Sequence, residues 1–154
     1  MLGIIGLGGI YRDAYKDALA YLQKKDIIVF DINKNSSTYA VKHAKKNGLE
    51  YMIANSVREV FEEASEICLF LPPKEILPVI KEGVELANKN IVTKFIYIEK
   101  PLGVNYSESK EIKQILNAYG IKLYYNEVFL HSSTTDILVE EVLSMRNGKV
   151  TSIE

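Results

Sequence analysis

Short apolar runs alternate along the chain with longer segments in which apolar residues recur at helical spacing. Six runs rich in Ile, Val, Phe and Tyr predict β-strands over residues 2–6, 27–31, 49–53, 66–71, 94–99 and 121–127. The runs at 27–30 and 95–98 are apolar at every position, which is typical of strands covered on both faces. This alternation predicts an α/β fold with a doubly wound parallel sheet.

The segments between these runs predict helices. The first carries one apolar stripe at i, i+3, i+4, i+7, i+8 and i+11, formed by Tyr11, Ala14, Tyr15, Ala18, Leu19 and Leu22. Asn105 and Glu108 have the spacing of a helix cap, and Gly120 is a suitable stop for the helix that follows. Further helices are predicted over residues 37–46, 57–63, 75–87 and 135–145, and a last strand begins near residue 150.

Composition narrows the class of protein. A chain of 154 residues fits one core, and its net charge of −1 offers no field that would hold a nucleic acid. The single cysteine, Cys68, excludes an internal disulfide framework and fits the cytoplasm. It lies in an apolar run and is expected to be a small buried side chain. No apolar stretch is long enough to span a membrane, and no cluster has metal-ligand spacing.

A glycine turn joins the first predicted strand to the first predicted helix. It reads Gly6-Leu7-Gly8-Gly9-Ile10-Tyr11, and this context is typical of dinucleotide binding. The first glycine permits a tight turn, and the second lets a pyrophosphate approach the backbone at the start of a helix. We therefore assign Gly6, Gly8, Gly9 and Ile10 to cofactor binding.

Asp31 ends the second predicted strand, where a carboxylate can accept both hydroxyls of an adenosine ribose. Its charge repels a 2′-phosphate, so NAD is favoured over NADP. The alternative is an ordinary glycine turn, with Asp31 capping a polar loop that includes Asn33 and Asn35. Tyr11 departs from the pattern, because its ring stands where a small third residue would allow close contact between helix and strand.

A second motif lies at the end of the fifth predicted strand and reads Glu99-Lys100-Pro101-Leu102-Gly103. Together with Leu71-Pro72-Pro73 after the fourth strand and the glycine turn after the first, it makes the chain resemble the Gfo/Idh/MocA oxidoreductases, the glucose-fructose oxidoreductase and inositol dehydrogenase group. The resemblance implies a Rossmann-like NAD(P)-binding domain, followed by a C-terminal substrate domain that often forms the oligomer.

The resemblance also implies roles for particular residues. Leu71 and Pro72 would line the cofactor cleft, and Glu99 and Lys100 would face the nicotinamide and the substrate. Lys100 would be the catalytic residue of this chain, orienting the reacting hydroxyl and stabilising charge; the alternative is a solvated loop lysine. Pro101 would fix the turn, with a cis bond as one way to do so.

Other positions depart from the family pattern. Ile76 stands where a histidine is usual, and Val128 where an arginine is common. His43 is expected on a solvated helix face, and His131 lies nearer the expected cleft. The family's aspartate and histidine acid-base pair belongs to the C-terminal domain, so residues 1–133 are assigned to the dinucleotide-binding domain and residues 134–154 to the start of a missing or truncated substrate domain.

Three hypotheses follow. The first is the cofactor-binding half of an NAD-dependent oxidoreductase that acts on CH-OH groups of a sugar, polyol or related small molecule. The second is a non-catalytic NAD-binding sensor or subunit, and the third a scaffold that binds no nucleotide. Apolar residues between Leu138 and Ile153 also predict a homo-oligomer, because exposed apolar surface tends to be buried by a partner.

Overall fold

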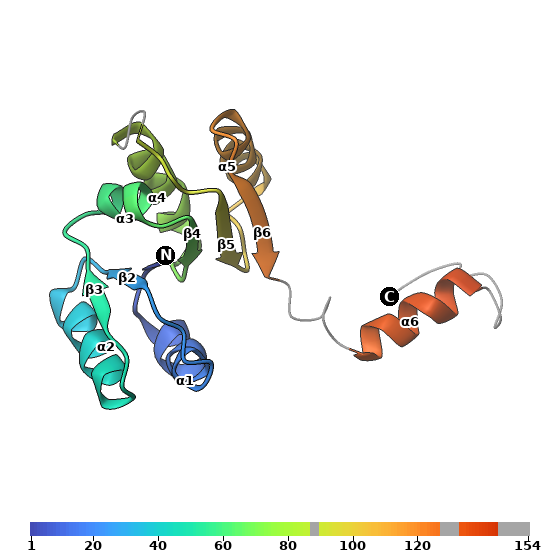
Figure 1. Ribbon diagram of the computed structural model, residues 1–154. Helices are drawn as coiled ribbons and strands as arrows, with labels where there is room; N and C mark the ends of the chain where they lie inside the picture. Colours follow the sequence, from blue (N-terminus) through green and yellow to red (C-terminus); the bar gives the residue numbers. More distant parts are fainter. Residues whose placement is uncertain (87–89, 127–132, 145–154) are drawn as a thin grey trace.

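The computed structural model describes residues 1–86, 90–126 and 133–144. Six parallel strands form one sheet in the order β3-β2-β1-β4-β5-β6 (Figure 1). The strands are β1 (Leu2–Ile5), β2 (Ile27–Phe30), β3 (Tyr51–Ile53), β4 (Glu66–Leu69), β5 (Phe95–Glu99) and β6 (Lys122–Asn126). The strand order reverses between β1 and β4, where ligands bind in open α/β sheets. The predicted doubly wound, Rossmann-like fold is confirmed.

Helices cover the sheet from two sides (Figure 1). A π-helical turn η1 (Tyr11–Tyr15) continues into α1 (Lys16–Tyr21), which lies with α2 (Lys34–Lys46) on one side. On the other side lie α3 (Val57–Glu63), α4 (Pro73–Leu86) and α5 (Tyr106–Ala118), and α6 (Ser133–Ser144) follows β6. None of the described helices combines the length and hydropathy needed to cross a bilayer.

Two apolar cores hold these layers together. Ile28 on β2, Ile67 on β4 and Ile96 on β5 pack against α3, α4 and α5. Ile4 on β1 and Val29 on β2 point to the opposite face, where they pack with apolar residues of η1, α1 and α2. This arrangement fulfils the expectation from the apolar run at 27–30, because successive side chains of β2 enter different cores.

Several predicted boundaries shift by one to three residues. β1, β2 and β4 end earlier than predicted, because Gly6 (φ +91°) already belongs to the turn and the chain leaves the sheet after Phe30 and Leu69. The helix expected at residue 37 begins at Lys34, because the Asn33 side chain caps it by accepting from the backbone N–H of Asn35 at 3.0 Å. The predicted Asn105 cap is confirmed: its side chain accepts from the Glu108 N–H at 2.9 Å.

The predicted stripe of the first helix is wrong in part. Ala14, Ala18 and Leu22 are exposed, whereas Tyr11 and Ala20 are buried. A π-turn contains one residue more than an α-turn, so η1 rotates the later side chains out of the phase expected for a regular helix. The turn therefore moves the buried face to Leu19 and Ala20.

The run at 95–98 differs from the prediction on one face. Ile96 and Ile98 are buried against α4 and α5, whereas Phe95 and Tyr97 are only half-buried on the other face. On that side α1 and α2 lie against β1, β2 and β3 (Figure 1). Within the described residues, helices therefore cover both faces of β2, as predicted, but only one face of β5. The predicted strand near residue 150 lies outside them.

Candidate functional site

The glycine turn leaves the carboxyl end of β1 through a backbone conformation that requires glycine. Gly6 has φ +91°, and a Cβ at this position would lie 2.5 Å from the carbonyl oxygen of Phe70 and 2.8 Å from the side chain of Leu71. Any side chain would both strain the backbone and collide with the segment after β4. Gly6 therefore lets the ends of β1 and β4 approach each other at the switch point.

Gly8, in contrast to Gly6, has open space around its Cα atom. A Cβ at Gly8 would meet no atom within 4 Å, and Gly8 borders a cleft of about 530 Å³ at the carboxyl ends of β1, β2 and β4. The carbonyl of Gly8 accepts from the Arg12 N–H at 3.0 Å, which begins the helical turn. The open space above Gly8 is what the approach of a phosphate to the backbone requires.

Asp31 ties the end of β2 to the glycine turn. Its Oδ2 accepts from the backbone N–H of Leu7 at 2.7 Å, and its Oδ1 accepts from the N–H of Asn33 at 2.8 Å. Asp31 therefore does cap the loop that follows it, as the alternative interpretation proposed. Because a carboxylate oxygen can accept more than one hydrogen bond, these contacts leave Asp31 able to bind a ribose, and they fix its orientation at the cleft.

The cleft brings together residues that are far apart in the sequence. Five of the predicted cofactor-binding residues border it, namely Gly6, Gly8, Asp31, Leu71 and Pro72. Residues that the sequence reasoning missed complete its walls, including Phe30, Ile32, Val57, Pro78 and Val79. Phe30 and Ile32 flank Asp31, so the rule that ligands bind at carboxyl ends of strands would have found them. Gly9 and Ile10 are exposed at the start of η1, outside the described lining.

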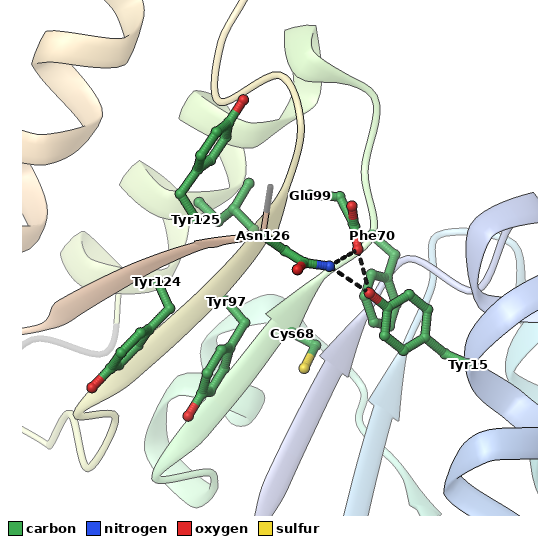
Figure 2. Close-up of a pocket in the computed structure, with 9 residues that line it drawn as sticks. Tyr15, Cys68, Phe70, Tyr97, Glu99, Tyr124, Tyr125 and Asn126 are labelled. Atoms are coloured by element: carbon green, nitrogen blue, oxygen red, sulfur yellow. Dashed lines mark hydrogen bonds between the residues drawn. The ribbon is translucent and has the colours of Figure 1, made fainter. Parts of the chain in front are cut away.

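Glu99 belongs to a different cavity, of about 390 Å³, on the face of β4, β5 and β6 (Figure 2). Its Oε1 accepts from the hydroxyl of Tyr15 and from the Asn126 side-chain amide, the latter at 2.6 Å. The same amide donates to the Tyr15 hydroxyl at 3.0 Å. This cluster, Tyr15, Glu99 and Asn126, joins η1 to the ends of β5 and β6.

Tyr15 is held in the cluster by packing as well as by hydrogen bonds. Its ring stacks on Phe70, with 4.2 Å between the ring centroids. Burial, followed by the hydrogen bond to Glu99, raises the pKa of Tyr15 to about 12. The hydroxyl therefore keeps its proton at neutral pH and serves as a donor to the carboxylate. Neither Tyr15 nor Asn126 belongs to a recognisable motif, and sequence reasoning missed both.

Comparison with known proteins defines the fold. No protein-family model and no curated protein matches the sequence. Among solved structures, a putative NADPH-dependent oxidoreductase from Desulfitobacterium hafniense is 20% identical with a TM-score of 0.73, over 97% of this chain and 40% of its own. The WlbA dehydrogenase from Bordetella pertussis, in complex with NADH and UDP-GlcNAcA, is 14% identical with a TM-score of 0.71, over 94% and 43%.

The apo scyllo-inositol dehydrogenase from Lactobacillus casei is also similar, at 14% identity and a TM-score of 0.69, over 97% of this chain and 43% of its own. The chain shares its Rossmann-like fold with these oxidoreductases and dehydrogenases. It spans about two-fifths of the length of the structures it matches. The fold expected from the sequence resemblance is thus confirmed.

The Glu-Lys-Pro motif ends β5 in this fold. The peptide bond between Lys100 and Pro101 is cis, which is one of the ways in which Pro101 could fix the turn. Lys100 is exposed, and it is not among the described residues that border either cavity. The two charged residues of the motif therefore have different surroundings. Glu99 belongs to the hydrogen-bonded cluster, whereas Lys100 lies at the surface beyond the end of β5.

The two remaining departures have structural explanations. Ile76, where the family pattern has histidine, is fully buried in the core under α4. His43 does not lie on a solvated face as predicted, because its Nε2 pairs with Asp17 on α1 at 3.0 Å and the side chain is mostly buried. Val128 and His131 lie outside the described residues. Among those described, no group of His, Cys, Asp and Glu has the arrangement of a metal site.

Tyr11 occupies the third position of the glycine pattern without disrupting the turn. Its side chain is completely buried in the core beneath η1, among residues that include Ala40 and Ala44 of α2. These small residues leave room for a tyrosine ring. The ring of Tyr11 therefore packs against α2 instead of obstructing the turn. Its buried hydroxyl, however, has no hydrogen-bond partner in the described part of the chain.

We expect Tyr11→Phe to stabilise the chain. An unpaired buried hydroxyl costs about 1–3 kcal/mol, so its removal should raise the melting temperature by several degrees, at about 2–4 °C per kcal/mol for a chain of this size. Thermal unfolding followed by circular dichroism measures this change. A melting temperature equal to or below that of the wild type would show that the hydroxyl is satisfied.

The pH dependence of the same variant provides a control. Burial raises the pKa of Tyr11 above its ordinary value of 10.0. The unfolded chain therefore loses this proton at a lower pH than the folded chain, and stability falls as the pH rises above about 10. Tyr11→Phe should remove this part of the alkaline loss, so that its advantage over the wild type grows between pH 9 and pH 11.

Proposed function

We propose that this chain is the NAD(P)-binding domain of an oxidoreductase that transfers hydride between a nicotinamide and a sugar, polyol or related small molecule. The observation that carries the proposal is the cleft at the β1/β4 switch point, bordered by Gly6, Gly8, Asp31, Leu71 and Pro72. The neighbours with this fold add support, since one was solved with NADH and UDP-GlcNAcA and another is a scyllo-inositol dehydrogenase.

The residues of the cleft fit a dinucleotide. The space above Gly8, where a Cβ would meet no atom within 4 Å, would admit the pyrophosphate. Gly9 and Ile10 would offer backbone N–H groups at the start of η1. Asp31 would accept the hydroxyls of the adenosine ribose, while Leu71 and Pro72 would form the apolar wall. NAD is the favoured cofactor, and NADP the less favoured one.

The nicotinamide, when bound, supplies the carbon that accepts or gives hydride. Lys100 would be the catalytic residue of this chain, orienting the reacting hydroxyl and offsetting charge. Glu99, fixed by Tyr15 and Asn126, would hold the end of β5 from which Lys100 projects. Residues 1–133 would form the cofactor-binding domain, and residues 134–154 would begin the substrate domain.

Titration with the two nicotinamide cofactors tests the proposal. NADH should bind saturably, and NADPH at least about tenfold more weakly, because two negative charges about 4 Å apart near a protein surface repel by several kcal/mol before relaxation. Fluorescence titration or calorimetry measures both affinities. Absence of saturable binding to either cofactor would overturn the proposal.

Asp31→Asn provides the matched variant. The amide keeps an oxygen that can accept from the Leu7 N–H, but it removes the charge that opposes the 2′-phosphate. We expect weaker NADH binding and a smaller difference between NADH and NADPH. An unchanged ratio would remove Asp31 from its assigned role while leaving the cleft as the binding site.

A non-catalytic NAD sensor is not favoured, because the structural neighbours are dehydrogenases. We further propose that the protein acts in the cytoplasm as a homo-oligomer, which the large exposed apolar side chains Tyr21 and Leu22 at the end of α1 support. Light scattering at high micromolar concentration tests the association. A strictly monomeric chain would contradict it.

A further inference from the structure

Among the described residues, one half of the sheet has an apolar face that no helix covers. We call this surface the open face and define it by Cys68 on β4, Phe95 and Tyr97 on β5, and Tyr124 on β6. In the strand register Cys68 lies beside Tyr97, and Tyr97 beside Tyr124. The rings of Tyr97 and Tyr124 stack with centroids 5.1 Å apart, and those of Phe95 and Tyr124 lie 5.9 Å apart. Figure 2 shows Cys68, Tyr97 and Tyr124 side by side along this face.

A parallel sheet normally has helices on both faces. Here α4 and α5 bury Ile96 and Ile98 on one face, but the described helices leave the other face of β5 and β6 open (Figure 1). Tyr124 is 48% exposed, and the cavity of about 390 Å³ beside Glu99 opens on the same surface. Burial raises the pKa of the Cys68 thiol to about 12, so this thiol reacts slowly at neutral pH, and changes in its rate of reaction report how exposed the open face is.

The next element of the chain carries a matching unpartnered surface. On α6, Val139, Val142 and Leu143 fall at i, i+3 and i+4, and they are 49%, 41% and 76% exposed. Ile137 lies on the opposite side of the helix by the same periodicity, whereas Asp136 and Glu140 flank the stripe on its Leu143 side. We call Val139, Val142 and Leu143 the α6 stripe. A helix of this kind normally buries its apolar stripe against a core.

The dimensions of the two surfaces agree. The 12 residues of α6 make a helix about 18 Å long and about 10 Å wide, and three strands about 4.8 Å apart present a strip of similar width. Only residues 127–132 separate β6 from α6, and six residues reach at most about 20 Å. Consecutive elements joined this closely are usually neighbours in space.

We propose that α6, which the proposed function places at the start of the substrate domain, docks on the open face of its own chain, with the α6 stripe against Tyr97 and Tyr124, and so covers this face of the sheet. Its own chain is the favoured occupant, because a short connection gives α6 an effective concentration near the millimolar range. Docking would also exclude water from the side of the cavity where Tyr15, Glu99 and Asn126 meet. The proposal does not depend on cofactor binding.

Disulfide trapping tests the docking, because Cys68 is the only cysteine in the chain. A second cysteine is introduced at one position of the α6 stripe at a time, as Val139→Cys, Val142→Cys or Leu143→Cys, and each protein is oxidised mildly. A disulfide forms only where the two Cα atoms come within about 7 Å. We expect at least one of these variants to form an intramolecular disulfide, seen as a faster-migrating monomer that reduction reverses.

Ile137→Cys is the matched control at an exposed position on the opposite side of α6, and it should not form the bond. Disulfide-linked dimers from the stripe variants would identify a second copy as the occupant and overturn the proposal. Equal trapping of the control, or no intramolecular bond in any stripe variant, would overturn it as well.

The alkylation rate of Cys68 in the otherwise unaltered chain gives an independent measurement. Val142→Asp should release α6 and increase the rate by about tenfold, as expected when a site that opens only transiently becomes exposed. Ile137→Asp, the same change at an exposed position near the opposite side of α6, should leave the rate unchanged. Both residues lie outside the two apolar cores, so the variants keep the sheet folded. Equal rates in Val142→Asp and the wild type would contradict the docking.

Discussion

Replacing Gly8 by valine should abolish NADH binding while the chain stays folded. A Cβ at Gly8 meets nothing within 4 Å, so the side chain fits the folded protein and fills the space that the pyrophosphate would need. Loss of two hydrogen bonds to a charged phosphate, each worth about 1.5–3 kcal/mol, lowers the affinity by about 100-fold or more. Calorimetric titration with NADH measures the effect, and circular dichroism checks the fold.

Gly9→Val is the matched control for this experiment. Gly9 is the next residue of the same turn, and the nearest atom to a Cβ there is Oδ2 of Asp13 at 3.8 Å. Gly9 lies outside the described lining of the cleft, and valine keeps the backbone N–H that Gly9 would offer, so this variant should lose much less affinity than Gly8→Val. Full NADH binding by a folded Gly8→Val variant would show that the turn is not a phosphate site.

Replacing Gly6 by alanine should destabilise the fold itself. The added Cβ would lie 2.5 Å from the carbonyl oxygen of Phe70, and the backbone has φ +91°. Strain in a sparsely populated conformation costs about 1–3 kcal/mol, and the clash with a backbone atom adds to it because that atom cannot rotate away. We expect a loss of about 3 kcal/mol or more, equivalent to roughly 10 °C in melting temperature.

Gly48→Ala separates the two causes of this loss. Gly48 also has a positive φ, +72°, but a Cβ there would meet nothing within 4 Å. Its replacement should therefore cost only the conformational strain, about 1–2 kcal/mol. Chemical denaturation of both variants gives the comparison. If Gly6→Ala is no less stable than Gly48→Ala, the contact between the ends of β1 and β4 is looser than the structure has it.

The two glycines of the turn thus serve different purposes. Gly6 permits a backbone path that brings β1 against the segment after β4, and Gly8 leaves space beside the cleft. A folded Gly8 variant without affinity, next to a destabilised Gly6 variant, would separate the proposed binding function from the requirements of the fold.

Local patterns in the sequence determined most of the architecture. The six apolar runs, the helical segments between them and the Asn105 cap depend on residues near one another in the chain, and the structure contains all of them. The position of Gly6, Gly8 and Asp31 at one edge also followed from local order, because the carboxyl ends of parallel strands meet there.

Tertiary structure decided what depends on contacts between distant residues. The π-helical turn at Tyr11 rotates the buried face of the first helix, because that ring packs into space left by Ala40 and Ala44 on another helix. Tyr15 meets Glu99 and Asn126 across separations of 84 and 111 residues, so no local motif could predict the cluster. The open face follows from the strand order, since β5 and β6 lie beyond the reach of α1 and α2. The periodicity of one segment indicates which apolar residues share a face of a helix or strand. Only the packing of all the segments determines which of these faces become buried.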